Sequence, residues 1–225
     1  MRYRLEAEYG IKISTGRVYR LMKGMQLPKM STEKKPAYKK GVKQAEEECK
    51  NLLKQRFNPE APNRVWASDI TYIKTLNGFC YLCVVLDLYS RKVIGWKVSK
   101  KIDSVLVIAA TEAAMSKRGW PEGILFHSDR GTQYRSKEFR KYADTKGLLQ
   151  SFSAPGYPYD NAVVEAFFKF MKKEETERRH FADEEEVKCS VFSYIEGFYN
   201  SKRPHSANDM LSPDEKESRF FGQNF

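Results

Sequence analysis

Cysteine and histidine are scarce in this 225-residue chain, which holds four cysteines and three histidines. Cys80 and Cys83 are spaced like a metal-binding or redox pair, but no second pair and no histidine cluster completes a zinc site. The two also lie in a strand-like run, in which residues three apart point to opposite faces. We therefore interpret the four cysteines as reduced thiols of the core, which is typical of a cytoplasmic protein.

Long apolar segments are absent as well. The longest uncharged apolar run covers residues 75–86 and is too short to span a bilayer. The N-terminus, MRYRLEAEYGIK, lacks the apolar region of a signal peptide. These absences predict a cytoplasmic protein that makes no membrane contact.

Positive charge is unevenly distributed. Of the net charge of +11, residues 1–64 carry +9, from 16 Lys or Arg against 7 Asp or Glu, and residues 65–225 carry +2, from 24 against 22. A basic arm on a nearly neutral body indicates a polyanionic partner, most simply nucleic acid, and a solvated tail explains the same charge equally well. The length of the chain and its 41% hydrophobic and 31% charged residues predict one sizeable core plus a small appendage.

A short basic helix is expected at residues 14–24, with a cap at Ser14 or Thr15. The segment resembles the second helix of a helix-turn-helix, yet little sequence precedes it. Residues 1–27 therefore predict a partial DNA-binding segment, and residues 28–64 predict a basic linker. Three basic side chains lie off the apolar stripe of the helix and can face phosphates: Arg17, Arg20 and Lys23.

From residue 65 onward the pattern changes to strands followed by alternating helices and strands. Runs of β-branched and aromatic residues joined by Asn77-Gly78 predict a hairpin, and a third strand follows it. This order predicts an α/β fold with a mixed five-stranded sheet in one domain over residues 65–225, with a helical C-terminal tail. Strands are expected at residues 65–74, 78–90, 92–99, 123–126 and 148–152, and helices at 104–117, 136–147 and 159–179.

Three acids of this region are poorly explained as solvated surface residues. Asp69 lies inside the first expected strand, Asp129 follows the fourth, and Glu165 sits among apolar residues of the last helix. Carboxylates converging from such positions could share divalent cations, and oxygen-only ligation favours Mg²⁺ or Mn²⁺ over zinc. Two such ions can support an in-line phosphoryl transfer. Lys172 projects from the same side of the helix as Glu165, either to grip a phosphate or as an ordinary exposed lysine.

Several motifs together carry a family resemblance. Asp69 in DITYI, Asp129 in HSDRGTQY and Glu165 in YDNAVVEAFF, with 35 residues between the last two acids, resemble the DDE triad of the retroviral-integrase-like transposases. These motifs, Lys172 and the tail YIEGFYNSKRPHSANDMLSP (residues 194–213) are similar to the second-reading-frame transposase of the third family of bacterial insertion sequences. The resemblance covers nearly the whole chain.

The resemblance implies a ribonuclease-H-like fold, the integrase catalytic core, and two Mg²⁺ or Mn²⁺ ions held by the three acids. The implied reaction cuts double-stranded DNA at the ends of an insertion sequence and joins the freed 3′-hydroxyl to a second phosphodiester. It needs no covalent protein–DNA intermediate and no organic cofactor, and it implies at least a dimer on the element ends and the target, in the bacterial nucleoid. The expected DNA contacts are Lys172, Arg130 and Asn161 of the core and Arg17, Arg20 and Lys23 of the N-terminal helix.

Two departures from the family pattern keep alternatives open. The N-terminal module looks shorter than in relatives, and Ala154-Pro155 stands where many relatives have basic residues. An active transposase is favoured, but a truncated, non-cutting remnant that occupies element ends would fit the short N-terminus. A ribonuclease H acting on RNA–DNA hybrids fits the acid spacing poorly. His127 and His205 are open between a packing role and a supporting role near the site or the DNA.

Overall fold

The computed structural model describes residues 2–26, 49–154 and 158–222. The chain divides into two units, Met1–Ala37 and Tyr38–Phe225. The first unit contains two helices, α1 (Arg2–Tyr9) and α2 (Thr15–Gly24).

Helix α2 confirms the helix expected near the N-terminus. The Ser14 side chain accepts the backbone N–H of Arg17 at its start, as an N-cap does. Helix α1 was not expected, because its eight residues carry no apolar stripe. The segment before Ser14 therefore contains a helix that the sequence did not indicate. Arg17, Arg20 and Lys23 are exposed on α2, and their contact with DNA stays a prediction.

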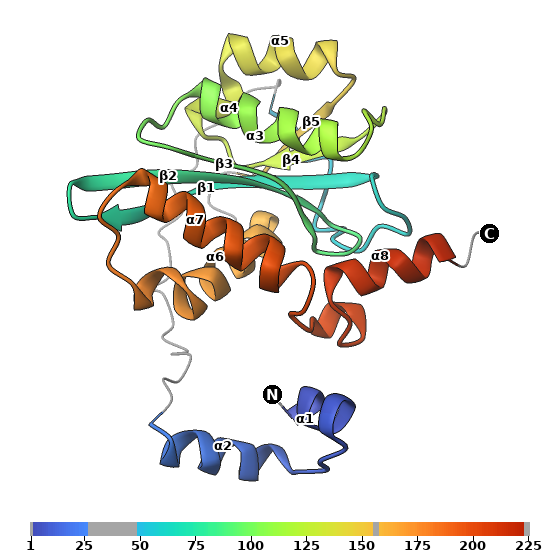
Figure 1. Cartoon of the computed structure of the whole chain (residues 1–225). Helices are drawn as coiled ribbons and strands as arrows, with labels where there is room; N and C mark the ends of the chain where they lie inside the picture. The colour runs from blue at the N-terminus through green and yellow to red at the C-terminus, as the bar shows by residue number, and fades with distance from the viewer. Residues whose placement is uncertain (1, 27–48, 155–157, 223–225) are drawn as a thin grey trace. The chain divides into compact units, whose positions relative to one another are not determined.

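A mixed five-stranded sheet forms the centre of the second unit (Figure 1). Its strands are β1 (Val65–Thr75), β2 (Gly78–Asp87), β3 (Val93–Ser99), β4 (Leu125–Ser128) and β5 (Leu149–Phe152). They lie in the order β3-β2-β1-β4-β5. The antiparallel pairs β1–β2 and β2–β3 confirm the expected meander, and β4 and β5 pair in parallel on the other side of β1.

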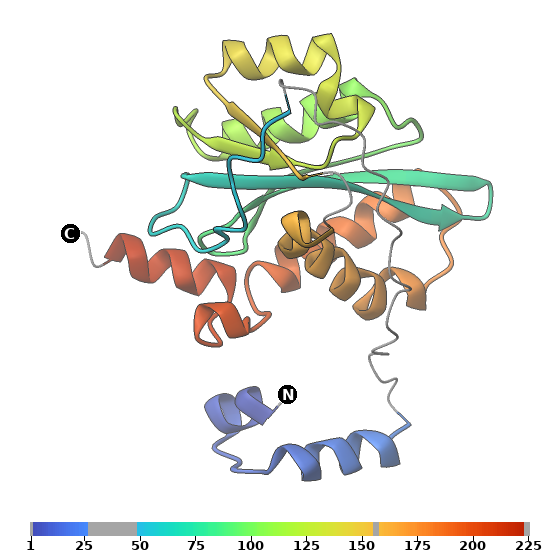
Figure 2. The same cartoon turned by 180° about the vertical axis from the view of Figure 1, so that it is seen from behind.

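Helices cover both faces of this sheet (Figures 1 and 2). One face carries α3 (Ser104–Lys117), α4 (Thr132–Arg135) and α5 (Lys137–Thr145), and the other carries α6 (Ala162–Glu174) and α7 (Glu184–Tyr194). The remaining elements are the 3-10 turns η1 (Pro158–Asn161), η2 (Thr176–Arg178) and η4 (Ser206–Asn208), the π-helical turn η3 (Ile195–Tyr199) and helix α8 (Pro213–Gly222). Among the helices described, none has the length and apolarity needed to cross a bilayer.

Alternation along β1 feeds both hydrophobic cores. Trp66 and Ile70 pack on the side of α3, and Ala67 and Ile73 pack on the side of α6 and α7. The sheet therefore has no solvated face where these helices cover it. This explains why the expected strands read as nearly continuous apolar runs.

Close contact between α3 and β3 depends on a glycine. A Cβ on Gly95 would lie 2.4 Å from the Ala110 carbonyl oxygen and 2.7 Å from the Ala114 Cβ. Any larger residue at this position would push α3 away from the sheet.

The cysteines are mostly placed as predicted. Cys80 and Cys83 are buried on opposite sides of the sheet, which confirms that they do not form a pair, and Cys49 is also buried. Cys189 of α7 is exposed. Its interpretation as a core thiol was wrong, because it lies on the solvent side of that helix.

The long helix expected at residues 159–179 is shorter in the structure. Helix α6 ends at Glu174 because Glu175 leaves the helical region, at φ −133° and ψ −68°. Arg203 donates to both carboxylate oxygens of Glu174, and Ser190 donates to Glu175 at 2.8 Å. Contacts from the C-terminal part of the chain therefore override the local helical pattern.

The linker expected at residues 28–64 is not a linker throughout. Residues 49–64 form no helix or strand, yet Cys49 and Leu53 are buried in the cores. The Leu53 N–H donates to the Ser151 hydroxyl oxygen of β5 at 3.1 Å. The core therefore begins earlier than predicted, and the rest of the expected linker lies outside the described residues.

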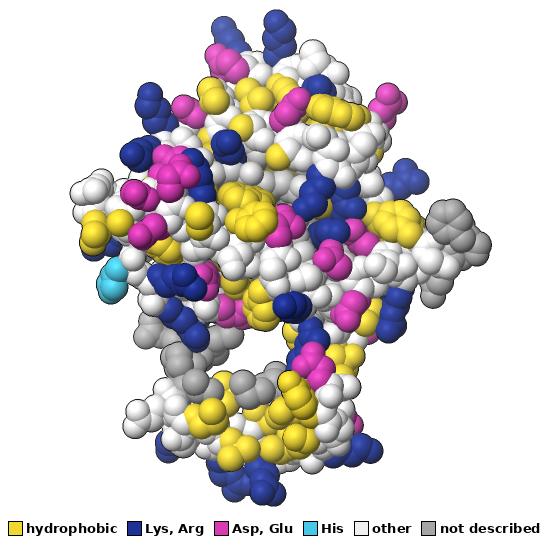
Figure 3. All heavy atoms as spheres, viewed as in Figure 1, with side chains coloured by type: hydrophobic (Ala, Val, Ile, Leu, Met, Phe, Trp, Pro, Cys, Tyr) yellow, Lys and Arg dark blue, Asp and Glu magenta, His cyan; other side chains and the backbone are white. Residues whose placement is uncertain are grey.

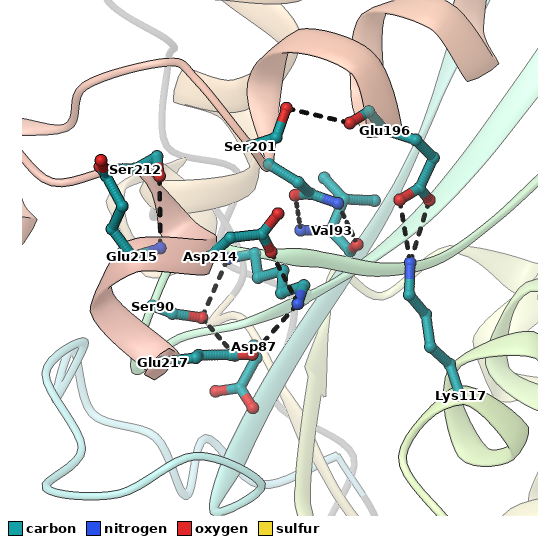
Figure 4. Close-up of polar contacts among 12 residues, drawn as sticks. Asp87, Ser90, Val93, Lys117, Glu196, Ser201, Ser212, Asp214, Glu215 and Glu217 are labelled. Carbon is teal, nitrogen blue, oxygen red and sulfur yellow. Dashed lines mark hydrogen bonds and ion pairs between the residues drawn. The ribbon is translucent and has the colours of Figure 1, made fainter. Parts of the chain in front are cut away.

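A buried ionic network ties α8 to the sheet (Figure 4). Glu217 is 4% exposed and accepts from the Ser90 hydroxyl at 2.7 Å and from Arg118 Nη1 at 2.9 Å. Lys92 pairs with Glu217 at 3.3 Å and with Asp214 at 2.7 Å. Burial acts to raise the pKa of Glu217, but Arg118, Ser90 and Lys92 together lower it below its ordinary value.

We expect Glu217→Gln to lower the free energy of unfolding by about 3 kcal/mol at pH 7, because it removes the nearer carboxylate of buried Arg118 and leaves only Asp87, at 3.7 Å. Because the pKa of Glu217 is lowered in the folded state, its ionic contacts stabilise the protein fully above pH ~4.3, the pKa in the unfolded chain. This stabilisation is lost as the pH falls through the pKa of Glu217 in the folded state. The difference from wild type should therefore narrow in acid. Urea denaturation between pH 7 and pH 3 measures this. A gap that does not change with pH would contradict the ionic role.

Candidate active site

The pairing of β1 with β4 places two of the predicted acids next to each other. The parallel register ends at Ser68↔Ser128, and Asp69 and Asp129 are the next residue along each segment. Neighbouring strands lie about 4.8 Å apart. The two aspartates therefore emerge side by side where the pairing ends. The carboxyl ends of parallel strands are a frequent location for sites in α/β sheets.

Helix α6 brings the third acid to the same region. Asp69 faces the side of the sheet that α6 covers, because it shares the alternation of Ala67. At the start of α6, Asn161 Nδ2 donates to the Ser68 carbonyl oxygen at 3.2 Å, one residue before Asp69. Glu165 follows in the first turn of α6 and is exposed.

The charges of the three acids act on one another. Burial, followed by the negative charges of Asp129 and Glu165, raises the pKa of Asp69 to about 7. Two groups act in the opposite direction: the Ile70 N–H, which donates to Asp69 Oδ1 at 2.8 Å, and the charge of Lys172. This cluster thus carries more negative charge than the nearby lysine offsets.

The donor set fits a hard divalent cation. The three acids supply carboxylate oxygens, which suit Mg²⁺ or Mn²⁺ better than zinc. Burial and the neighbouring negative charges raise the pKa of Asp69, and a bound cation would compensate both. In the part of the chain that the structure describes, no three His, Cys, Asp or Glu side chains converge as a ready-made metal site.

The turn after β4 is built around Asp129. Its Oδ1 accepts the Gly131 N–H at 2.8 Å, and the Ser128 hydroxyl donates to the Asp129 carbonyl oxygen at 2.9 Å. A Cβ on Gly131 would lie 2.9 Å from the same Oδ1. Ser128 and Gly131 therefore shape this turn, and a larger residue at position 131 would push the Asp129 carboxylate aside.

Lys172 approaches the acids from further along α6. Its side chain is half-buried, and its charge lowers the pKa of Asp69. Its Nζ lies 4.6 Å from the ring centroid of Tyr72, which in turn packs edge-on against Phe79. The spacing along the helix therefore does bring the ammonium group to the site, and its contact with DNA stays a prediction.

Arg130 and Asn161 were expected to contact DNA, and in the structure both donate to backbone carbonyl oxygens beside the acids. Arg130 Nε donates to the Ser153 carbonyl oxygen at 3.0 Å, and its Nη2 donates to the Cys49 carbonyl oxygen at 2.8 Å. Asn161 is 6% exposed and donates to the backbone of β1. Both side chains hold backbone segments around the site, and their contact with DNA stays a prediction.

The two histidines whose roles were open are packed and neutral. His127 is buried between the hydroxyls of Ser151, 2.9 Å from Nδ1, and Ser153, 3.2 Å from Nε2. His205 packs edge-on against Tyr199. Burial lowers the pKa of each to about 4, so both act as structural residues at neutral pH.

Sequence reasoning missed Asp160, the residue before Asn161. Asp160 is 2% exposed and accepts hydrogen bonds from the Asn51 and Gln55 side chains and from the Ala154 N–H. An acid directly before the start of a helix was a visible signal. Its side-chain partners lie 109 and 105 residues away in the sequence, inside a stretch that looked like a linker.

Comparison with known proteins identifies close relatives. Two family models, both described as integrase core domain, match residues 59–158 and 146–213. The transposase for insertion sequence element IS904 of Lactococcus lactis is 39% identical over 209 residues, which cover 92% of this chain and 82% of that protein. The transposase InsF for insertion sequence IS3A of Escherichia coli is 43% identical over 169 residues, 75% of this chain and 59% of its own length.

Solved structures show the same fold at low sequence identity. A chain of the simian T-cell lymphotropic virus intasome has a TM-score of 0.59 at 20% identity, covering 71% of this chain and 56% of its own. The HTLV-2 integrase catalytic core domain in complex with magnesium has a TM-score of 0.53 at 18% identity, covering 70% and 98%. The Mos1 transposase catalytic domain with Mn has a TM-score of 0.50 at 17% identity, covering 60% and 72%.

These structures establish the ribonuclease-H-like fold of the integrase catalytic core, with its mixed five-stranded sheet flanked by helices. The sequence relatives establish the family. The chain therefore belongs to the IS3 family of DDE transposases, polynucleotidyl transferases of DNA transposition.

Proposed function

We propose that this transposase cuts and joins DNA at the ends of an insertion sequence, with Asp69, Asp129 and Glu165 holding two Mg²⁺ or Mn²⁺ ions. The observation that carries the proposal is the register of β1 with β4, which sets two aspartates side by side near the first turn of α6. The metals named for the HTLV-2 core and for Mos1 support the same choice of cation. When bound, such cations activate the attacking hydroxyl or water and stabilise the leaving oxygen.

The residues of the chain then divide the remaining work. The partly buried Asp69 provides one ligand, the turn at Gly131 orients Asp129, and α6 presents Glu165. Lys172 holds a DNA phosphate beside the acids. Tyr134 does not serve as a nucleophile, because it is fully buried and its hydroxyl lies 2.8 Å from the Ser68 hydroxyl. The attacking groups are water and the DNA 3′-hydroxyl.

The proposed partners are double-stranded DNA and further copies of the chain. Joining two element ends requires at least two copies, and the HTLV-2 core is described in dimeric and trimeric forms. On the face of the core seen in Figure 3, acidic and basic side chains are interspersed. The exposed basic residues of α2, Arg17, Arg20 and Lys23, are therefore the proposed source of affinity for element ends.

The non-cutting remnant is not favoured. Its support was the short N-terminal module, but that segment contains two helices, and all three acids are present, with the charges of Asp129 and Glu165 acting on Asp69. The relatives are transposases, which gives no support to a nuclease for RNA–DNA hybrids. The chain spans 59% of the length of the Escherichia coli relative. The property to test is therefore whether this chain cuts and joins DNA without further protein.

Glu165→Gln should reduce metal-dependent nicking and joining by at least about 100-fold, because loss of one ligand removes several kcal/mol of transition-state stabilisation. A cleavage assay on labelled duplex carrying the element ends, with Mg²⁺ or Mn²⁺, measures this. Glu177→Gln, an exposed glutamate of η2, is the matched control and should cut like wild type. Equal cutting by both variants would show that Glu165 is not a ligand. Wild type that binds ends without cutting would favour the remnant.

Gly131→Ala should lower the cleavage rate by about 10- to 100-fold with less than ~1 kcal/mol of destabilisation, because its Cβ displaces the Asp129 carboxylate by a fraction of an ångström. Gly197→Ala is the control, since a Cβ there meets no atom within 4 Å. Cleavage rates and thermal midpoints of both variants provide the test. A Gly131→Ala enzyme with normal cleavage would mean that the position of the Asp129 carboxylate does not matter.

Lys172→Gln should weaken DNA binding several-fold at low salt and reduce the slope of log affinity against log salt by about one phosphate contact. Lys141→Gln on α5, which packs on the opposite face of the sheet, should leave the slope unchanged. Fluorescence anisotropy with labelled DNA between about 50 and 200 mM salt measures both. An unchanged slope for Lys172→Gln would exclude the phosphate contact.

A further inference from the structure

We infer that Asp160 is a positioning residue of the active site. It fastens residues 49–55, named here the connector, to the start of α6, so that the placement of Glu165 depends on a segment outside the sheet. The inference rests on the proposed role of Glu165 and assigns Asp160 and the connector a part in the reaction.

The contacts of Asp160 are short and specific. Oδ2 accepts from Asn51 Nδ2 at 2.8 Å and from the Ala154 N–H at 2.8 Å, and Oδ1 accepts from Gln55 Nε2 at 2.9 Å. All three donors are N–H groups, and the carboxylate is 2% exposed. Buried hydrogen bonds to a carboxylate are among the stronger polar contacts in proteins, so this junction is firmly held.

Two consecutive side chains thus hold the start of α6 from two directions. Asn161 donates to the backbone of β1 beside Asp69, and Asp160 joins the connector. Helix α6 begins at the next residue, with Glu165 in its first turn. Any movement of this junction is passed directly to the Glu165 carboxylate, and displacements near 1 Å can cost about 100-fold in rate.

The connector is itself anchored next to the other end of the site. The Leu52 and Leu53 N–H groups donate to the Ser151 hydroxyl oxygen at 3.0 and 3.1 Å. Because that oxygen accepts two hydrogen bonds, its own proton goes to His127 Nδ1, which leaves His127 Nε2 as the donor to Ser153. His127 lies on β4, two residues before Asp129. The connector therefore links the segments that carry two of the three acids.

A purely structural role for Asp160 makes different predictions from a positioning role. Loss of a structural contact lowers stability in proportion to the lost hydrogen bonds, wherever they lie. Loss of a positioning contact loosens the first turns of α6 and slows the chemical step. Asn200 supplies the matched structural case, because its buried side chain makes two hydrogen bonds to Val93 of β3, away from the acids.

The experiment compares full-length wild type with Asp160→Ala, Asp160→Asn, the double variant Asn51→Ala/Gln55→Ala, and Asn200→Ala. The first readout is hydrogen exchange, without DNA or metal, of the first amides that bond within α6, Ala166 to Phe168. The second is the single-turnover cleavage rate at saturating DNA and Mg²⁺. The double variant guards against misfolding of Asp160→Ala, because Asn51 is half-buried and Gln55 is exposed.

We expect Asp160→Ala to speed exchange and to slow cleavage by about tenfold or more, and the connector variant to move both in the same direction. Asp160→Asn should stay within about fivefold of wild type, because the Gln55 amide can rotate to accept from the new amide group. Asn200→Ala should lose stability and change neither readout.

Unchanged exchange in Asp160→Ala, or faster exchange with an unchanged cleavage rate, would overturn the inference. Equal effects in Asn200→Ala would overturn it too, because the loss would then be one of general stability. If the wild type does not cut, the proposed function fails instead, and exchange in α6 alone decides whether Asp160 positions the helix.

Discussion

The parallel pairing of β1 with β4 is the constraint on which the rest of the site depends. Because the register ends at Ser68↔Ser128, Asp69 and Asp129 must leave the strand pair next to each other. Burial of Asp69, followed by the negative charges of Asp129 and Glu165, raises its pKa to about 7 and makes its charge unfavourable. An unfavourable carboxylate keeps its position only where several other contacts fix the backbone around it. Ser68 illustrates this: its hydroxyl donates to Val84 of β2, and its carbonyl accepts from Asn161 of η1.

Features that depend on local periodicity could be predicted from the sequence. The β-branched and aromatic runs on both sides of Asn77-Gly78 fixed the hairpin, and alternation placed Cys80 and Cys83 on opposite faces. The five strands and the helices of the core appeared in the expected order. The acids were recognisable because a carboxylate within an apolar strand or beside apolar helix residues needs compensation.

Features that depend on long-range partners could not be predicted. The connector has no periodicity, and its burial arises from β5 and η1, about 100 residues away. The backbone contacts of Arg130 and Asn161 were likewise not predictable, because their carbonyl partners lie 23 to 93 residues away in the sequence. Cys189 was misplaced because α7 is amphipathic only weakly, so its buried side is not evident from the sequence.

The charge distribution indicates a division of labour between residues 1–64 and the rest of the chain. DNA is a polyanion, and the catalytic core presents it with a cluster of acids and a net charge of only +2 over residues 65–225. Such a core cannot attract DNA over long distances, and the mixed charges of its visible face in Figure 3 agree with that. Long-range attraction must come from the +9 of residues 1–64, and the proposed cations and Lys172 would supply local attraction at the acids. The first contribution is screened by salt, whereas the second acts at short range in a partly buried site. Recruitment of DNA and the chemical step should therefore respond differently to ionic strength, because different parts of the chain supply the charge for each.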